Sequence, residues 1–557
     1  MPILHPEYEF RTDLGKNVFY ARYALTQAET WRQRAKTIVD EVCGTVGGTK
    51  HPLLSQEELD LLVEAISTFK FLPGGRYIYY AGRTANFYNN CYLFKSEEDT
   101  REAWAELCEK AASALMTGGG IGNDYSVFRP RGSLLNRTGG QASGPIPLMQ
   151  MINEIGRNVM QGGSRRSAIY ASLNWAHEDS AEFLQIKDWD SQKIPGTDLT
   201  YGDAKKADFN FPCPLDMTNI SLNYDDAWLN LDDRATHSTF LTNVRFAMMN
   251  GEPGFSFNFG DKEDETARNA CTEVTSRDDS DVCNLGSLNM GAIESLEEFE
   301  AIVAVASKFL VCGTLRGDLP NDKIREVREK NRRLGLGLMG VHEWLLKRGY
   351  RYEANPELTK WLEAYERLSE SAANEQCDRF YISRPVAYRA IAPTGTIGIL
   401  AGTTGGIEPL YAVAYKRRYL IGGTKYKYEY VVDHTAQTLI DQHGVDPNSI
   451  ETAADLAKDP ERRIAFQAYV QDYVDMAISS TLNLPEWGSK WNNEKKVEEM
   501  AHIISKYAPR LRGLTFYPDG ARGGQPITQI PYEEAIKHKG LVFEENVDCG
   551  GSGVCGI

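Results

Sequence analysis

The chain has 557 residues, enough for about three or four average domains or for one large α/β barrel with extensions. Its 61 basic and 77 acidic side chains leave a net charge of −16, which argues against a broad phosphate-binding face for nucleic acid. Apolar residues make up 42% of the chain, and no window reaches the roughly 18 uninterrupted apolar residues of a membrane helix. We therefore expect a cytoplasmic protein that binds neither nucleic acid nor membrane.

Residues 1–75 are predicted to form a helical region. Thr26 with Glu29, and Ser55 with Glu58, have the spacing of capping boxes, in which a hydroxyl and a carboxylate satisfy free amides at a helix start. Further along, short apolar runs are separated by glycine-rich loops and by longer helical patterns, as at 296–315 and 357–380. Alternation of strand, glycine loop and helix is typical of an α/β fold with its functional loops at one end. We expect this catalytic unit to span residues 76–545.

An amide, a thiol and a carboxylate occupy alternate positions in the segment NACTE, as Asn269, Cys271 and Glu273. In an extended segment alternate side chains share one face, so the three groups would point towards the same ligand. The carboxylate could then act as a general base. A single intracellular cysteine is more often a small buried apolar residue, so the triplet alone does not establish an active site.

Residues 546–557 have too few large apolar groups to pack and enough glycine to stay mobile, so we predict a flexible tail. The tail contains Cys549 and Cys555. Ten cysteines are too few for a disulfide scaffold in a chain of this size, and the sequence has no CxxC or HExxH motif of a metal site. The cysteines that matter are therefore expected to be catalytic or redox-active, with no protein-bound metal.

A series of short segments runs along the chain in the order found in one known family. They include NNCYLF at 89–94, GGGIGNDYS at 118–126, GGQASGP at 139–145, GGSRRSA at 162–168, GEPGF at 251–255, CNLGSLN at 283–289, NRRLGLGLMG at 331–340, APTGTIG at 392–398 and GGIEP at 405–409. With these, the sequence resembles the catalytic subunit of ribonucleotide reductases, and most of all the class II, adenosylcobalamin-dependent branch. The resemblance implies an α/β fold: a ten-stranded α/β barrel of that type with an inward finger loop and an N-terminal helical region.

The resemblance also implies catalytic roles. Cys271 would become a thiyl radical that removes the 3′ hydrogen of a ribonucleotide, inside a barrel from which water is excluded. Glu273 would take the proton of the 3′ hydroxyl as general base, and Asn269 would hydrogen-bond the sugar hydroxyls. Cys91 and Cys283 would deliver two electrons by forming a disulfide.

This chain departs from the family at the finger loop. The family motif in class II usually reads Asn-Pro-Cys-Gly-Glu, whereas Ala270 and Thr272 stand here in place of Pro and Gly. The three chemical groups are kept, so the departure concerns the shape of the loop.

The resemblance places a substrate phosphate site in APTGTIG, where small residues let main-chain amides approach an anion at a helix start. It also places two specificity loops, which would sense a deoxynucleotide effector with magnesium, at RTGGQASGP and MQGGSRRSA. The phosphate-site residues are Pro393, Thr394, Gly395 and Thr396, and the effector-loop residues are Thr138, Gly139, Gly140, Arg165 and Arg166.

Reducing partners and assembly follow from the same resemblance. Cys549 and Cys555 would reduce the internal disulfide by thiol exchange, and thioredoxin or glutaredoxin would then regenerate the tail. A homodimer is expected.

The radical source depends on the segment TFYPDGAR at 515–522. Phe516 precedes Tyr517, and phenylalanine has no O–H to relay a proton-coupled electron, so adenosylcobalamin is favoured over a radical-generating, metal-containing beta subunit. That class I-like arrangement stays open, as do the choice between di- and triphosphate substrates and two further hypotheses. These are a non-catalytic nucleotide-binding paralogue and a thiol–disulfide carrier.

Overall fold

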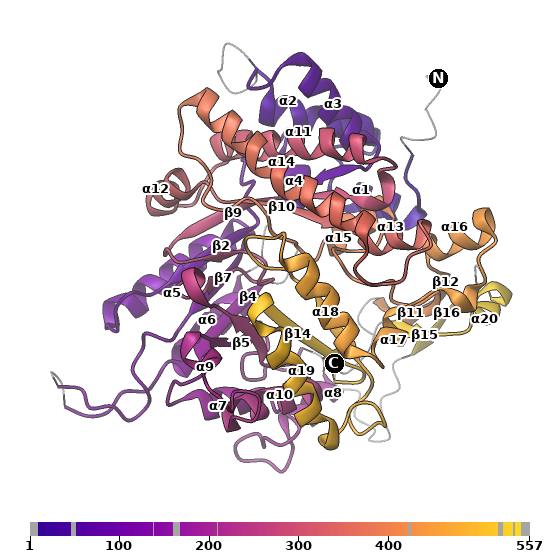
Figure 1. Ribbon diagram of the computed structural model, residues 1–557. Helices are drawn as coiled ribbons and strands as arrows, with labels where there is room; N and C mark the ends of the chain where they lie inside the picture. The colour runs from indigo at the N-terminus through magenta and orange to yellow at the C-terminus, as the bar shows by residue number, and fades with distance from the viewer. Residues whose placement is uncertain are drawn as a thin grey trace.

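The computed structural model describes residues 9–45, 52–136, 139–159, 167–208, 210–421, 425–521, 527–538 and 541–546. One half of its large sheet consists of strands that run parallel to their neighbours, with helices between them (Figure 1). These strands are β2 (Cys91–Lys95), β3 (Gly120–Asp124), β4 (Ile169–Asn174), β5 (Thr218–Tyr224) and β6 (Gly254–Phe257).

The second half closes the sheet into a barrel. Strand β9 pairs in parallel with β10, β13 pairs in parallel with β14, and the extended segment 387–391 joins the two pairs through bridges at Leu336–Arg389 and Ile391–Ile478. The halves meet in antiparallel fashion at β2–β9 and at β6–β14. The large sheet therefore confirms the predicted ten-stranded barrel, with β9 at Asp281–Asn289, β10 at Leu334–Met339, β13 at Thr481–Leu484 and β14 at Gly513–Pro518.

Side chains alternate between the two faces of the barrel wall. On β5, Ile220, Leu222 and Tyr224 join an apolar cluster with the surrounding helices, while the intervening positions are polar. Because successive residues of a strand point to opposite faces, the polar positions face the barrel interior. The helices on the outside of this half are α5 (Arg101–Met116), α6 (Ile146–Asn158), α7 (Ser180–Gln185), α8 (Tyr201–Ala207), α9 (Asp226–Leu229) and α10 (Ser238–Asn250).

The N-terminal helices pack onto the barrel and share its core. Residues of α1, α2, α3 and α4 lie in one apolar cluster with α11 and α14, which cross the upper part of Figure 1. The strand β1 (Phe71–Pro73) pairs with β9, so the predicted helical range 1–75 already contains a strand of the large sheet. The helices are α1 (Asp13–Arg22), α2 (Trp31–Cys43), α3 (Gln56–Ser67), α4 (Gly75–Tyr80), α11 (Leu296–Arg316) and α14 (Pro356–Phe380).

One of the two predicted capping boxes is confirmed. Ser55 and Glu58 cap α3 reciprocally, whereas Thr26 and Glu29 lie in a turn before the next helix. The box of α2 is formed by Thr30 with Gln33, one turn further on. Glutamine serves there as well as glutamate because its side-chain oxygen accepts the same main-chain N–H.

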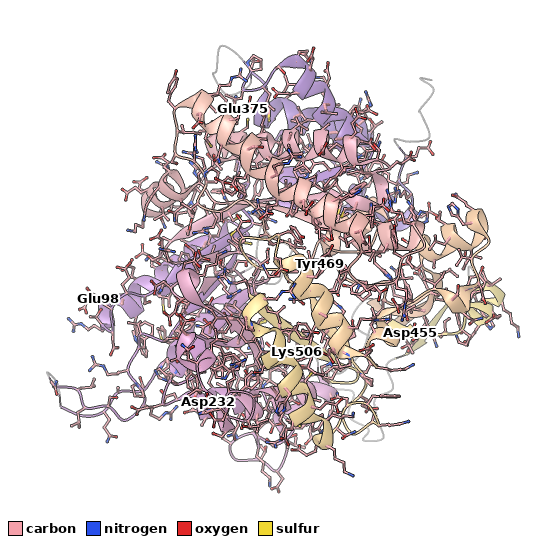
Figure 2. The ribbon with its side chains drawn as sticks, viewed as in Figure 1. Glu98, Asp232, Glu375, Asp455, Tyr469 and Lys506 are labelled. Carbon is pink, nitrogen blue, oxygen red and sulfur yellow. The ribbon has the colours of Figure 1, made fainter. Side chains whose placement is uncertain are left out.

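Helices of the second half are linked to one another by side-chain contacts. Tyr469 of α18, near the centre of Figure 2, hydrogen-bonds Thr359 of α14 at 2.7 Å, and Lys506 of α19 pairs with Glu461 of α18 at 2.6 Å. No helix in the described ranges combines the length and apolarity needed to cross a bilayer. The remaining helices are α12 (Asp322–Asn331), α13 (Val341–Lys347), α15 (Gly395–Ala401), α16 (His434–His443), α17 (Ala453–Leu456), α18 (Pro460–Gln471), α19 (Val497–Tyr507) and α20 (Tyr532–Lys537).

A small antiparallel sheet lies beside the barrel, at the right of Figure 1, and the sequence patterns did not predict it. Its order is β15–β11–β12–β16, so the last described strand is held by the hairpin β11–β12. Asn546 belongs to β16, and the rest of the predicted tail lies outside the described residues. The strands are β11 (Ala414–Ile421), β12 (Lys425–Val432), β15 (Ile527–Gln529) and β16 (Val542–Asn546).

Candidate active site

A short hairpin between β6 and β9 enters the barrel. Its strands are β7 (Ala267–Arg268) and β8 (Thr275–Ser276), and residues 269–274 form its tip. The Arg268 side chain is fully buried and donates hydrogen bonds to the carbonyl oxygens of Arg512 at 2.6 Å and Thr272 at 3.2 Å. A Cβ atom at Gly122 of β3 would lie 1.9 Å from the Arg268 carbonyl oxygen. Glycine at 122 therefore lets the hairpin pass directly against the inner wall, as expected of an inward finger.

The tip is a turn, so the predicted extended conformation of residues 269–273 is wrong. The Thr272 amide donates to the Asn269 carbonyl oxygen at 3.0 Å, and Thr272 has a φ of 72°. Side chains of Asn269 and Glu273 are buried, whereas Cys271 is exposed. A chain that must reverse between two short strands cannot keep the alternation of a strand. The left-handed region disfavours a β-branched residue, so Thr272 adopts a φ that the glycine of the class II motif would take more easily.

The two predicted redox cysteines meet across the junction of the barrel halves. Cys91 of β2 and Cys283 of β9 are direct partners in the antiparallel ladder, and neither is in a disulfide. Directly opposed residues have Cα atoms about 4.5–5.5 Å apart, within the range that a disulfide spans. A Cβ atom at Gly335 would lie 2.9 Å from the Cys283 sulfur, so the glycine leaves the room that this thiol occupies.

The finger tip contacts this cysteine pair. Asn269 Nδ2 donates to Cys91 Sγ at 2.9 Å, and Asn269 Oδ1 accepts from the Val274 amide at 3.0 Å. The structure thus brings a hydrogen-bonding amide of the finger and the predicted redox thiol of the wall together, although the sequence separates them by 178 positions.

Burial dominates the electrostatics of the site. It raises the pKa of the Glu273 carboxyl to about 7, and a hydrogen bond from Asn269 opposes this shift in part. Burial also raises the pKa of the Cys91 thiol, with the charges of Glu273 and Cys271 adding to the effect, which requires the three groups to lie close together. Burial likewise raises the pKa of Cys283. The paired cysteines are therefore protonated thiols at neutral pH, while Glu273 is poised to gain or lose a proton.

Cys271 differs from the expectation of a thiol from which water is excluded. It is exposed, while its neighbours Ala270 and Glu273 are buried. The sulfur therefore sits at the accessible end of an otherwise buried finger, where a ligand can reach it.

The predicted phosphate loop starts beside the cysteine pair. Ala387 and Ala390 share an apolar cluster with Cys91 and Cys283, and the chain continues from them into residues 393–396. Thr394 has a φ of 53°, precedes the first residue of α15, and accepts a hydrogen bond from the Gly406 amide at 2.8 Å.

Gly395 is exposed, and no atom lies within 4 Å of the position that a Cβ would take there. The start of α15 is thus open to a ligand, but the assignment of Pro393, Thr394, Gly395 and Thr396 to a phosphate stays a prediction.

The effector-loop and tail predictions are tested only in small part. Gly139 and Gly140 have φ values of 66° and 108° and lie in a turn ahead of α6, with open space where a Cβ would point. Their role in binding an effector stays a prediction. Thr138, Arg165, Arg166, Cys549 and Cys555 lie outside the described residues.

The segment at 515–522, on which the predicted radical source depends, places Phe516 and Tyr517 next to each other on β14. Phe516 is buried against Phe255, with ring centroids 6.0 Å apart and planes at 90°, in the cluster outside the barrel wall. Tyr517 is the next residue of β14 and pairs with Asn483 of β13. Because neighbours on a strand point to opposite faces, Tyr517 is expected on the face opposite to the outer cluster that holds Phe516.

Sequence reasoning missed two groups that hold the tip. Asn219 of β5 donates from Nδ2 to the Ala270 carbonyl oxygen at 3.3 Å, and the Ala477 amide donates to the Glu273 carbonyl oxygen at 2.8 Å. Asn219 could have been noticed as part of the alternation of polar and apolar residues in TNISLNY at 218–224. The local sequence could not have predicted the role of Ala477, because nearly every residue type has the same main-chain amide.

Comparisons with known proteins agree with this geometry. The profile of the family described as "Ribonucleotide reductase, barrel domain" matches residues 89–206, 257–377 and 384–517. A vitamin B12-dependent ribonucleoside-diphosphate reductase of Mycobacterium tuberculosis (strain CDC 1551 / Oshkosh) is 25% identical over 514 residues, covering 83% of this chain and 72% of that protein. A putative adenosylcobalamin-dependent ribonucleoside-triphosphate reductase of Mycobacterium phage D29 is 27% identical over 534 residues, covering 79% of this chain and 72% of that protein.

Solved structures show the same fold. The class Id ribonucleotide reductase alpha subunit of Actinobacillus ureae superimposes with a TM-score of 0.70 at 15% identity, covering 93% of this chain and 98% of that one. A B-12 dependent, class II ribonucleotide reductase gives a TM-score of 0.69 at 16% identity, covering 94% of each chain. Since the family profile matches more than half of the chain, and the barrel, finger and opposed cysteines agree with it, the chain belongs to the ribonucleotide reductase barrel family.

Proposed function

We propose that this chain reduces ribonucleotides to deoxyribonucleotides by thiyl-radical chemistry. The observation that carries the proposal is the contact between finger and wall: Asn269 of the tip hydrogen-bonds Cys91, which lies directly opposite Cys283. This arrangement puts an exposed thiol, a buried carboxyl and a dithiol within one site. A thiol–disulfide carrier that used the tail cysteines would need none of the finger.

Each group has a task that fits its surroundings. Cys271, exposed at the tip, would lose its hydrogen atom and then take the 3′ hydrogen of the sugar. Glu273, whose pKa is raised to about 7 by burial, would accept the proton of the 3′ hydroxyl. At the end of the cycle Cys271 would return its hydrogen atom to C3′, which restores the thiyl radical, and Glu273 would return its proton to the 3′ oxygen. Between these steps the 2′ hydroxyl would gain one hydrogen and leave as water, and C2′ would gain another. Both hydrogens would come from the thiols of Cys91 and Cys283, which become a disulfide. Both are protonated thiols, which suits a step that transfers hydrogen with its electron.

The proposed radical source is adenosylcobalamin. The names of the relatives in Mycobacterium tuberculosis and in Mycobacterium phage D29 give this cofactor for those proteins. The site fits an external one-electron reagent in one respect, because Cys271 is exposed at the tip of the finger. When bound, this cofactor supplies homolytic, one-electron chemistry. In this chain Cys271 would receive the radical, and Phe516, which has no O–H and faces the outer cluster, would take no part.

The partners of the reaction are also proposals. Thioredoxin or glutaredoxin would restore the dithiol through Cys549 and Cys555. A homodimer is proposed as well, because the resemblance to the family implies one. A deoxynucleotide effector with magnesium would bind at the loops that flank α6.

Reduction of CDP and CTP with dithiothreitol, with and without adenosylcobalamin, tests the proposal. We expect deoxynucleotide only when the cofactor is present. Product that appears only on addition of a metal-containing partner subunit would replace the proposed radical source by the class I-like alternative. Nucleotide binding without product under either condition would favour a non-catalytic paralogue.

A further inference from the structure

The Cys271 thiol is flanked by two anchored carbonyl groups. On its C-terminal side, the buried Arg268 side chain holds the Thr272 carbonyl oxygen at 3.2 Å. On its N-terminal side, Asn219 holds the Ala270 carbonyl oxygen at 3.3 Å. Arg268 belongs to the finger itself, whereas Asn219 belongs to the barrel wall. Asn219 is therefore a side-chain connection from the wall to the residue that precedes the thiol.

The position of Asn219 in the wall is well fixed. Its main chain pairs with Tyr170 in the parallel ladder of β4 and β5. Just before it, the Met217 amide and the Thr218 hydroxyl both donate to Asn153 Oδ1 of α6 at 2.9 Å. The start of β5 is thus tied to a strand on one side and to a helix on the other.

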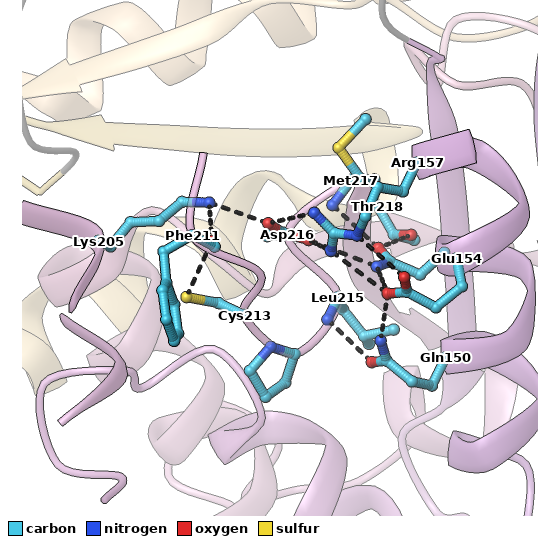
Figure 3. Close-up of polar contacts among 12 residues, drawn as sticks. Gln150, Glu154, Arg157, Lys205, Phe211, Cys213, Leu215, Asp216, Met217 and Thr218 are labelled. Atoms are coloured by element: carbon cyan, nitrogen blue, oxygen red, sulfur yellow. Dashed lines mark hydrogen bonds and ion pairs between the residues drawn. The ribbon is translucent and has the colours of Figure 1, made fainter. Parts of the chain in front are cut away.

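A buried ion cluster strengthens this attachment (Figure 3). Asp216, whose side chain is 3% exposed, pairs with Lys205 of α8 at 2.9 Å and with Arg157 in the last turn of α6. Figure 3 shows the two cations approaching the carboxylate from opposite sides. A buried carboxylate that has two cationic partners is costly to displace, since removing either partner leaves charge in a poorly solvated site. Asp216 therefore fixes the chain three residues before Asn219.

From these contacts we infer that Asn219 is a positioning residue for Cys271, which holds the thiol-bearing turn of the finger against a strand that Asp216 anchors. This inference rests on the proposed function for its catalytic meaning. The hydrogen bond orients the peptide between residues 270 and 271, and the direction of the sulfur follows from that peptide. A displacement of about 1 Å of a reacting atom can lower a rate on the order of 10²-fold.

The exposure of Asn219 makes a clean test possible. Its side chain fills no cavity, so Asn219→Leu removes the amide donor, keeps the size and leaves the core intact. Asn493→Leu is the matched control, because the Asn493 amide likewise donates to a main-chain carbonyl, that of Ser489 at 2.7 Å, but in the loop before α19. Asp216→Asn is the second variant, which removes the anchor's charge.

The first measurement is the rate at which iodoacetamide alkylates Cys271 in the full chain, followed by mass spectrometry of its peptide. The half-exposed Cys108 of α5 serves as reference in the same sample. We expect the Cys271 rate to rise several-fold in Asn219→Leu and less in Asp216→Asn, with Cys108 unchanged. The control variant should match the parent chain.

The second measurement is the split between kcat and KM for nucleotide reduction. We expect kcat to fall on the order of 10²-fold with KM nearly unchanged, because the substrate still binds while the thiol is misplaced. An unchanged Cys271 alkylation rate in Asn219→Leu overturns the inference, and an unchanged rate in Asp216→Asn overturns the anchoring part. If the parent chain makes no deoxynucleotide, the proposed function fails while the alkylation result still decides the positioning role.

Discussion

Cys91 and Cys283 stand directly opposite each other in an antiparallel ladder, although 192 positions separate them in the sequence. The ladder is one of the two seams at which the halves of the barrel meet. At that seam the finger also delivers Asn269 to the Cys91 sulfur. Barrel closure therefore pairs the two cysteines of the proposed reductant and places them against the finger.

This opposition predicts a specific disulfide. When the chain turns over without external reductant, a Cys91–Cys283 disulfide should form, because opposed strand residues lie within bonding range. Mass spectrometry of non-reduced peptides checks the link. Cys312→Ala, which removes a buried cysteine of α11, should leave it in place, and Cys283→Ala should abolish it. A disulfide between any other pair of wall or finger cysteines would contradict the assignment.

Cys271→Ser should lower turnover by at least on the order of 10³-fold, because the serine O–H bond is too strong to form the corresponding radical. Since Cys271 is exposed, the substitution should leave the thermal midpoint and nucleotide binding unchanged. Activity assays paired with thermal unfolding separate the two effects, and Cys108→Ser is the control. A serine variant that still makes deoxynucleotide would remove Cys271 from the mechanism.

The rate should depend on pH through Glu273. Burial raises the pKa of this carboxyl to about 7, so the base form is lost as the pH falls through that value. We expect kcat/KM, which reports the free enzyme, to rise between about pH 6 and pH 8 with an apparent pKa near 7. In Glu273→Gln, kcat/KM should be much lower and should no longer rise over this pH range. A parent profile that is level down to pH 5 would argue against Glu273 as the base.

The same carboxyl should affect stability. Its pKa rises from 4.5 unfolded to about 7 folded, so the folded chain holds the proton more tightly and the free energy of unfolding falls as the pH rises between these values. Glu273→Gln should therefore raise the free energy of unfolding at pH 8 by on the order of 3 kcal/mol, with little effect near pH 4. Denaturant titrations at both pH values check this, with the exposed Glu109→Gln as control. If Glu273→Gln and Glu109→Gln changed the free energy of unfolding equally at pH 8, the raised pKa of Glu273 would be contradicted.

Gly395→Ala probes the phosphate loop without disturbing the core. A Cβ at 395 meets no atom within 4 Å, so the thermal midpoint should be kept. The added methyl group would stand where main-chain amides are expected to approach the phosphate, and KM should rise while kcat changes little. Steady-state kinetics give the answer. If KM is unchanged, the start of α15 does not bind the substrate.

The sequence by itself determined the fold class and the family. Ordered motifs identified the barrel, and apolar periodicity located the helices at 296–315 and 357–380, which became α11 and α14. These features are local: a helix face or a glycine turn is set by residues a few positions apart. The identities of Asn269, Cys271, Glu273 and the cysteine pair could be predicted for the same reason, because each sits in a short motif.

Only the tertiary structure decided how these groups are oriented. The tip is a turn with Thr272 at positive φ, Cys271 is exposed, and Asn219 reaches the Ala270 carbonyl oxygen from another strand. None of this follows from neighbours along the chain, because a two-residue strand has too little local preference to fix the path of a loop. The direction of the finger is set by contacts with the barrel wall, and those exist only once the ring has closed.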